Sequence, residues 1–366
     1  MRFPEFTEDY EKHNLGELGD TLIGLTYSPT DVVTDGGTIV LRSSNIKNGV
    51  TNYDDIVRVN KKIKESIITR PNDILVCARN GSPRLIGKNA ILKEADSNIT
   101  FGAFMMIYRS IDNTYIHQLL STRRFYSQVG ENLGARINQI TTSDFNSFEF
   151  YFPVSKKERI KIASFLTLID KRIATQIKII EQLQSLIKGI RASLFSFDNY
   201  KIKYLGELCS ITTGKLDANA MVENGKYPFF TCAEETFRID EYAFDTEALL
   251  ISGNGANLGY IHYYNGKFNA YQRTYVLDKF SVEVMYLKYF LETFLNRRIN
   301  QEVNVGNTPY IVLSTLTKMK IKIPDISQQR NIINILSNLN LKLKQEKDML
   351  LAYQKQKAYL LRYLFI

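Results

Sequence analysis

The sequence predicts an α+β fold with two globular segments of mixed α and β structure and two long helices. Three kinds of motif predict it, because each occurs twice in the same order along the chain. A tyrosine stands five residues before an LGEL motif, a proline stands six residues before an arginine, and a heptad pattern ends in Leu-Phe. Such duplication predicts an internal repeat and a pseudo-two-fold arrangement. The paired motifs are LGEL at 15–18 and 205–208, Pro153/Arg159 and Pro324/Arg330, and Leu-Phe at 194–195 and 364–365.

The long helices are predicted within 153–196 and 324–366. Apolar residues recur there at alternating steps of three and four, which is the spacing of a coiled-coil seam. Each helix has one such stripe, so the two helices are expected to pair and form a rod of roughly 55 Å. Polar seam residues such as Gln176, Glu346 and Lys357 weaken a seam and fix its register. The apolar seam positions are Leu166, Ile169, Ile173, Ile180, Leu183 and Ile187 in the first helix, and Leu336, Leu339, Leu343, Leu350, Tyr353 and Leu360 in the second.

The globular segments are expected at 1–152 and 197–323. Short apolar runs bounded by Gly, Asn and Asp predict strands at 37–44, 73–79 and 247–255. Helical patterns follow at 114–129 and 283–301. The two segments share their framing motifs and differ inside, which indicates two binding modules with different specificities.

Composition and charge narrow the class of protein. The 366 residues are 44% hydrophobic and 23% charged, which excludes a disordered chain. The net charge of +9 favours an anionic partner, nucleic acid first. That charge lies in the two helices, so the globular segments would bind DNA through local clusters.

Other features exclude several classes. Three cysteines and three histidines without ligand spacing argue against a disulfide framework and a metal site. No apolar run of about 20 residues is present and the first residues are charged, so a cytoplasmic protein without a membrane segment is expected.

Two segments partly match known catalytic or cofactor-binding motifs, and both are incomplete. NTPY at 307–310 lacks the first proline of the N-P-P-Y loop of adenine methyltransferases, and no F-x-G-x-G for a methyl donor precedes it. SGNGANLG at 252–259 lacks the G-x-G-x-x-G spacing of a dinucleotide site. No catalytic residue is therefore predicted, and both segments are interpreted as turns that shape a binding surface.

Clusters of side chains suited to reading base edges are the candidate site. Arginine pairs with guanine, and asparagine or glutamine with adenine. For any single residue, solvation or loop structure is the stronger explanation, so the hypothesis concerns the clusters. The candidate DNA-binding residues are Arg42, Ser43, Ser44, Asn45, Lys47, Arg79, Asn80, Ser82, Arg84, Arg136, Asn138 and Gln139 in the first segment, and Thr231, Glu234, Asn254, Asn257, Tyr271, Arg273, Asn307 and Tyr310 in the second.

In this order, the motifs resemble those of the specificity subunits of type I restriction–modification systems over nearly the whole chain. RFPEF at 2–6, RSSNIKNG at 42–49 and KFNAYQRTYVL at 267–277 add to the repeated motifs. Tyr10 and Tyr200 stand where the family usually has tryptophan.

The resemblance implies that 1–152 and 197–323 are target recognition domains, each reading one half of a bipartite double-stranded DNA target. The helices would be an antiparallel coiled coil that fixes the gap between half-sites and docks two methyltransferase subunits, which two restriction subunits then join. S-adenosylmethionine, ATP and Mg²⁺ would be bound by those partners, with no cofactor or metal on this chain. Three alternatives stay open: a regulator with two nucleic-acid-binding modules, a coiled-coil scaffold that binds proteins, and a methyltransferase without its catalytic half.

Overall fold

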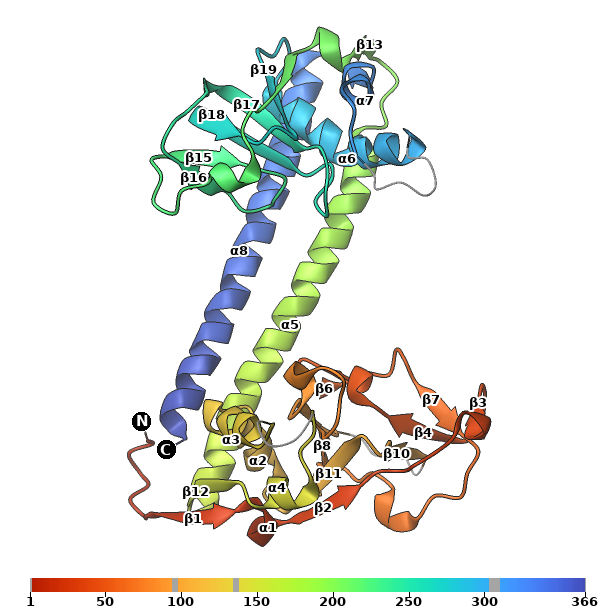
Figure 1. The fold of residues 1–366 in the computed structure, drawn as a ribbon, viewed down its shortest axis with the longest axis vertical. Coiled ribbons are helices and arrows are strands. Elements are labelled where there is room, and N and C mark those ends of the chain that lie inside the picture. Colours follow the sequence, from red (N-terminus) through yellow and green to blue (C-terminus); the bar gives the residue numbers. More distant parts are fainter. Residues whose placement is uncertain (1, 94–97, 134–137, 303–309, 366) are drawn as a thin grey trace. The chain divides into compact units, whose positions relative to one another are not determined.

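The computed structural model describes residues 2–93, 98–133, 138–302 and 310–365. The chain divides into two compact units. Unit 1 comprises Met1–Ile177 and Met349–Ile366, and unit 2 comprises Lys178–Asp348. Both combine sheets with helices, as the sequence predicted. The helices α5 (Lys156–Leu194) and α8 (Ile326–Leu364) are each 39 residues long, and each contributes one part to either unit (Figure 1).

The described part of unit 1 is built on two four-stranded sheets, ordered β2-β11-β8-β9 and β10-β4-β7-β3, with two-stranded sheets β1-β12 and β5-β6. Strand β8 is buried on both faces, since Ile74 and Val76 join one hydrophobic core while Leu75 and Cys77 join another. Strands buried in this way read as continuous apolar runs, which is why the sequence predicted this one. The strands are β1 (Tyr10–Asn14), β2 (Asp20–Ile23), β3 (Val32–Val33), β4 (Thr38–Leu41), β5 (Ile46–Lys47), β6 (Val50–Thr51), β7 (Val57–Val59), β8 (Ile74–Cys77), β9 (Asn89–Ile91), β10 (Ile99–Phe101), β11 (Met105–Arg109) and β12 (Glu149–Pro153), and the helices besides α5 are α1 (Leu15–Leu18), α2 (Asn113–Leu119), α3 (Arg123–Leu133) and α4 (Thr142–Asn146).

The helical pattern expected at 114–129 is two helices rather than one, α2 and α3. The break lies at Thr122, whose hydroxyl donates to the Leu119 carbonyl at 2.7 Å and accepts from the Phe125 amide at 3.4 Å. A threonine that bonds its own backbone in this way ends one helix and begins the next. Phe125 and Val129 then pack into the same core as α2, so the apolar spacing persists across the break.

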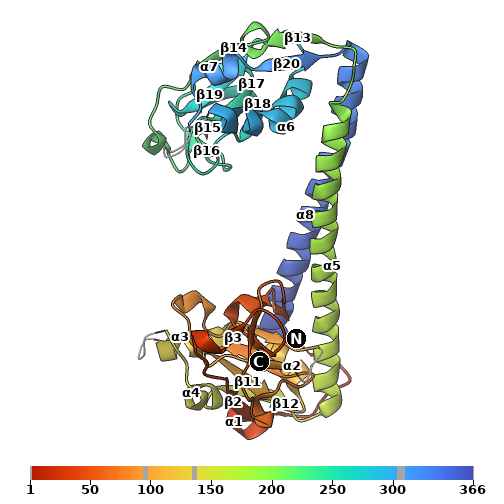
Figure 2. The same ribbon diagram turned by 90° about the vertical axis from the view of Figure 1, so that its right-hand side faces the viewer.

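Unit 2 is built on a six-stranded sheet, ordered β14-β19-β17-β18-β15-β16, and a two-stranded sheet β13-β20. Strand β17 again divides its side chains, with Leu249 and Ile251 in one core and Ala248 and Leu250 in the other. Helix α6 packs on the first of these cores and matches the helix expected at 283–301 (Figure 2). The elements are β13 (Lys201–Tyr204), β14 (Ser210–Thr213), β15 (Tyr227–Phe230), β16 (Phe237–Ile239), β17 (Phe244–Ser252), β18 (Ile261–Ala270), β19 (Thr274–Asp278), α6 (Val284–Glu302), α7 (Leu313–Thr317) and β20 (Lys320–Ile323).

The LGEL motifs occupy corresponding places in the two units. Each follows the first strand of a two-stranded sheet whose second strand leads into a long helix. The amide of Leu15 donates to the Phe148 carbonyl at 3.1 Å, and that of Leu205 donates to the Met319 carbonyl at 2.9 Å. Both leucine side chains are fully buried. The motif therefore ties the start of each globular segment to its end.

The predicted seam positions of the long helices are all buried or half-buried. Neighbours off the stripe, such as Leu168 and Leu341, are more than half exposed, at 58% and 55%. In unit 1, the first part of α5 shares a core with the end of α8. In unit 2, the end of α5 shares a core with the first part of α8. The Lys357 ammonium contacts the Asp170 carboxylate at 2.5 Å in unit 1.

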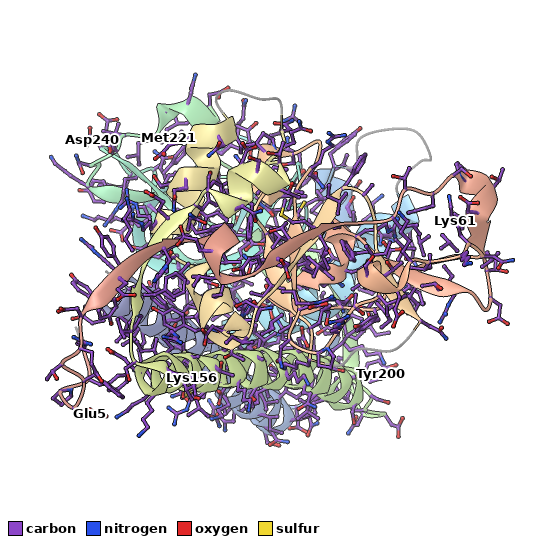
Figure 3. All side chains as sticks on the ribbon, turned by 90° about the horizontal axis from the view of Figure 1, so that it is seen from below. Glu5, Lys61, Lys156, Tyr200, Met221 and Asp240 are labelled. Atoms are coloured by element: carbon purple, nitrogen blue, oxygen red, sulfur yellow. The ribbon has the colours of Figure 1, made fainter. Side chains whose placement is uncertain are left out.

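A buried carboxylate marks the entry to α5. Glu158 is fully buried and accepts two hydrogen bonds from Arg2, at 2.8 and 2.7 Å, and one from the Tyr10 hydroxyl at 3.2 Å. The segment before β1 is thereby held against the helix. Figure 3 shows Glu5 of this segment beside the start of α5 at Lys156, on the side of unit 1 opposite Lys61.

Acid is expected to destabilise unit 1 through His117. Burial lowers the pKa of His117 to about 4, against the opposing effect of the Asp170 carboxylate. The folded state therefore holds this imidazole neutral, while the unfolded chain protonates it near its ordinary pKa of 6.5. Stability is expected to fall as the pH drops below 6.5, by about 2 kcal/mol at pH 5. Urea unfolding at pH 7, 6 and 5 measures this, and His117→Asn should flatten the pH dependence. The same change at the more exposed His13 is the control, and equal slopes for both variants would contradict the assignment.

Candidate nucleic-acid interface

In unit 1, the structure brings together three loops that are far apart in the sequence. The Asn80 side chain donates to the Ser43 hydroxyl at 3.1 Å, and the Asn80 amide donates to the Asn138 carbonyl at 3.3 Å. The Arg79 guanidinium donates to the side-chain oxygen of Gln139. The loops at 42–47, 79–84 and 138–139 therefore form one surface, which we call site 1.

Within site 1, some candidate residues in the loop at 42–47 stabilise the loop itself through hydrogen bonds or ion pairs. Asn45 is fully buried, accepts from the Arg42 amide at 2.8 Å and donates to the carbonyls of Asn52 and Asp55 at 3.0 and 2.8 Å. An asparagine used in this way shapes the loop, because both of its amide hydrogens are bonded to backbone and its side chain is buried away from a base. Arg42 is partly buried and pairs with Asp55 at 2.9 Å. The exposed Lys47 contacts Asp54 at 3.1 Å.

Sequence reasoning missed Phe104, which lies in site 1. Its ring is 60% exposed, and the Arg79 guanidinium lies over it at 5.6 Å from the centroid. The Phe104 carbonyl accepts from the amides of Ala78 and Arg79, both at 3.0 Å. An exposed aromatic ring beneath an arginine holds the guanidinium in place through a cation–π contact. The run GAFMMIYR gave no signal for this, because the phenylalanine reads as part of the following apolar strand.

In unit 2, four loops also meet, and we call their surface site 2. Asn257 donates to the Cys232 carbonyl at 3.2 Å, and the Cys232 thiol lies 3.4 Å from the Arg273 carbonyl. The Gly253 amide donates to the same Arg273 carbonyl at 2.9 Å, and the Gly253 carbonyl accepts from Ile311 at 2.8 Å. The loops at 231–234, 253–257 and 271–273 and the residues at 310–311 are therefore adjacent.

His262 is a member of site 2 that sequence reasoning did not select. Its Nε2 lies 2.9 Å from the Ala233 carbonyl, and its ring packs between Phe230 and Tyr260, with centroids at 5.2 and 4.8 Å. Burial lowers the pKa of His262, which favours the neutral ring. It therefore positions the loop at 231–234 without adding charge.

Gly253 is required for the close packing of site 2. A Cβ on this residue would lie 2.4 Å from the Arg273 carbonyl oxygen, which belongs to the backbone and has no room to move. Gly253→Ala is expected to destabilise unit 2 by about 1–3 kcal/mol. The matched control is Gly189→Ala in α5, where the added methyl meets nothing within 4 Å and should stabilise by about 0.5–1 kcal/mol. Denaturant titration measures both changes, and a neutral effect at Gly253 would count against the tight approach of these loops.

The turns at the centres of the two sites match. In unit 1, the Met105 amide donates to the Gly102 carbonyl at 2.8 Å, and in unit 2 the Thr274 amide donates to the Tyr271 carbonyl at 2.8 Å. Each turn begins a strand that pairs antiparallel with a strand buried on both faces. By this register, Phe104 corresponds to Arg273. The two units therefore share the backbone arrangement of this turn and differ in the side chains that it carries.

The candidates differ in exposure. Arg136 and Asn307 lie outside the described residues, and Thr231 is buried at 6% exposure. The exposed candidates are Ser44, Lys47, Arg79, Arg84, Glu234, Arg273 and Tyr310, and the half-buried ones are Arg42, Ser43, Asn80, Ser82, Asn138, Gln139, Asn254, Asn257 and Tyr271.

Together the two sites offer guanidinium, amide, hydroxyl and carboxylate groups on loops held by backbone hydrogen bonds. These are the groups that read base edges in the major groove. Across the described ranges, no cluster of three or more His, Cys, Asp or Glu side chains has the geometry to hold a metal ion. Over the same ranges, no helix combines the length and apolar character needed to span a membrane.

Comparison with known proteins gives one consistent family. The model of the family described as "Type I restriction modification DNA specificity domain" matches residues 7–185 and again residues 198–351. The specificity subunit of the Escherichia coli type I restriction enzyme EcoDI is 41% identical over 141 residues, 38% of this chain and 31% of that protein. A putative type I specificity subunit of Mycoplasma genitalium is 25% identical over 251 residues, 63% of this chain and 65% of that protein. The matches thus span between about a third and two thirds of these relatives.

Solved structures share the fold. The type I restriction–modification S subunit from M. genitalium has a TM-score of 0.68 at 20% identity and covers 100% of this chain and 99% of that one. A chain from a study of complex assembly and conformational transition in the type I system has a TM-score of 0.59 at 15% identity, covering 98% of both chains.

Proposed function

Because the chain belongs to the family of type I restriction modification DNA specificity domains, we propose that it is the subunit that selects the DNA target in such a system. Sites 1 and 2 each read one half of a bipartite sequence in double-stranded DNA. The target recognition domains are 1–152 and 197–323, related by a pseudo-two-fold repeat. The chain itself is not catalytic.

One observation supports this proposal most. In each unit, candidate residues drawn from separate loops meet at one surface around a matching turn. The frame of that turn is the same in both units, while its side chains are Phe104 in one and Arg273 in the other. A common frame with different side chains is suited to two modules that bind the same polymer and prefer different base sequences.

The long helices supply the second part of the proposal. As an antiparallel coiled coil, α5 and α8 set the gap between the half-sites and dock two methyltransferase subunits. Their outer faces support this, because Leu168, Leu186 and Leu351 are 58%, 56% and 49% exposed. A subunit docked there would remove these side chains from water, which favours association. Two restriction subunits then join, and S-adenosylmethionine, ATP and Mg²⁺ are bound by these partners.

Mapping of methylated adenines tests the proposal. The chain is co-expressed with the methyltransferase subunit of its own system, and host DNA is sequenced by a single-molecule method that detects methyl groups. The expected result is one split motif with a fixed gap. A stable complex that leaves host DNA unmethylated, or methylation at an undivided motif, would contradict the two-site assignment.

A further inference from the structure

Each unit contains a groove that belongs to neither recognition site. The groove of unit 1, about 470 Å³, lies between the end of α8, the junction of α2 and α3, and β12. The groove of unit 2, about 710 Å³, lies between the end of α5, α6 and β20. We call them groove 1 and groove 2, and the elements that form them are labelled in Figure 2.

The two grooves are equivalent by position. Each is lined by the phenylalanine of the Leu-Phe pair at the end of a long helix, Phe365 in groove 1 and Phe195 in groove 2. Each has a wall formed by the strand that pairs with the segment before LGEL, β12 or β20. Each has a second wall formed by helices, α2 and α3 after β11 in unit 1 and α6 after β19 in unit 2. Two matching grooves in one chain indicate two copies of the same occupant.

Both grooves are lined by cations. Groove 1 contains Arg123, Arg124 and Arg362, and groove 2 contains Arg297, Arg298, Lys318, Lys320 and Lys322. The described lining of either groove includes no aspartate or glutamate. Glu149 lies at the edge of groove 1, where its carbonyl accepts from Arg124 at 3.0 Å, but its carboxylate is paired with Lys12 at 2.7 Å. This surplus of cations favours an occupant that carries negative charge.

The floors of the grooves are apolar. Phe150 and Leu119 lie under groove 1, and Phe290, Phe294 and Met319 under groove 2. A phosphate backbone gains little from such a floor, since its sugars and phosphates stay hydrated. In a protein segment that carries both kinds of side chain, the carboxylates can pair with the cations of the groove and the apolar side chains can pack on its floor. The chemistry of the grooves thus favours an acidic amphipathic segment over nucleic acid.

We propose that grooves 1 and 2 each bind the same acidic amphipathic segment, contributed by two copies of one partner protein. This inference rests on the proposed function in taking that partner to be the methyltransferase subunit. The grooves hold one copy at each recognition domain, in addition to the contacts along the long helices. The arginines of groove 1, which project from α3 and α8, and the lysines in and just before β20 supply the ion pairs.

Charge reversal in the grooves tests the proposal. Arg123→Glu with Arg362→Glu changes groove 1, Lys318→Glu with Lys320→Glu changes groove 2, and a fourfold variant changes both. All four side chains are exposed, so folding should be preserved, and Gln versions of the same variants guard against a folding defect. The control reverses four other exposed lysines, Lys62, Lys64, Lys226 and Lys279, with the same change in net charge.

Binding of the purified methyltransferase subunit is measured by calorimetry and native mass spectrometry. The wild-type chain and the control should bind two copies, each single-groove variant should retain one tight copy, and the fourfold variant should bind about tenfold or more weakly. Binding of a 30 bp duplex without the target is measured in parallel. Two tight copies on the fourfold variant would overturn the groove assignment alone. Loss of duplex binding with two copies retained would make the grooves a DNA surface. A wild-type chain that binds no methyltransferase would overturn both this inference and the proposed function.

Discussion

Lengthening both long helices by one heptad is expected to widen the preferred gap between the half-sites without changing either half-site. The insertions go between Ile177 and Lys178 in α5 and between Asp348 and Met349 in α8, where the two units divide. These points lie seven and eight residues along the helices from the Asp170–Lys357 ion pair, so the added heptads lie nearly opposite each other. Seven residues add about 10 Å to the pair, which corresponds to three base pairs at most.

The shift should be smaller than this limit, because each base pair also turns the duplex, and three turn it by nearly a third of a turn. Methylation mapping of the variant measures the new gap directly. The control inserts the heptad into α5 alone, which displaces one seam against the other and should abolish modification of both the old and new sites. An unchanged gap with both helices lengthened would reject the helices as the element that sets the spacing.

Arg79→Ala is expected to weaken binding of one half-site and leave the other unchanged. Arg79 is exposed, bonded to Gln139 and held over Phe104, so its guanidinium is presented in a fixed direction. Loss of one such base contact costs about 1–3 kcal/mol, or roughly 5- to 150-fold in affinity. Arg42→Ala should have a smaller effect, since the Arg42 side chain is already paired with Asp55.

The measurement uses the complex with the methyltransferase subunit and three duplexes: the full target and two versions with one half-site scrambled. Arg273→Ala is the reciprocal variant, because Arg273 is an exposed arginine of site 2 and stands in the turn that matches the one containing Phe104. Arg79→Ala should lose affinity for one half and Arg273→Ala for the other. If either variant lost affinity equally for both halves and for unrelated DNA, its arginine would be a phosphate contact and the assignment of separate sites would fail.

The elements of regular structure were largely predictable from the sequence. Strand β8 and helix α6 lie within or close to the predicted ranges, β17 overlaps its predicted range but begins three residues earlier, and the seam positions of the long helices are buried or half-buried. These signals are local, because periodicity records which face of an element is buried. The break between α2 and α3 was not predicted, since Thr122 keeps the apolar spacing and acts through its hydroxyl.

The candidate sites were predictable only as groups of loops. Ser43, Asn80 and Asn138 meet through contacts between residues far apart in the sequence, and no local pattern encodes them. Asn45 and Arg79 carry equally suitable groups in the sequence, yet one is fully buried and bonded to backbone while the other is exposed. A side chain that can hydrogen-bond a base can equally cap a turn. The packing of the loop therefore determines which of these two roles the side chain has.

The division of the chain has a consequence for synthesis on the ribosome. Unit 2 is one continuous stretch, Lys178–Asp348, whereas unit 1 also needs Met349–Ile366. Its core includes Leu360 and Leu364, which are translated after all of unit 2. Although most of unit 1 is made first, unit 2 is therefore the first to have all its parts. Until the ribosome has passed residue 364, the stripe on the first part of α5 lacks its partner and needs protection from aggregation.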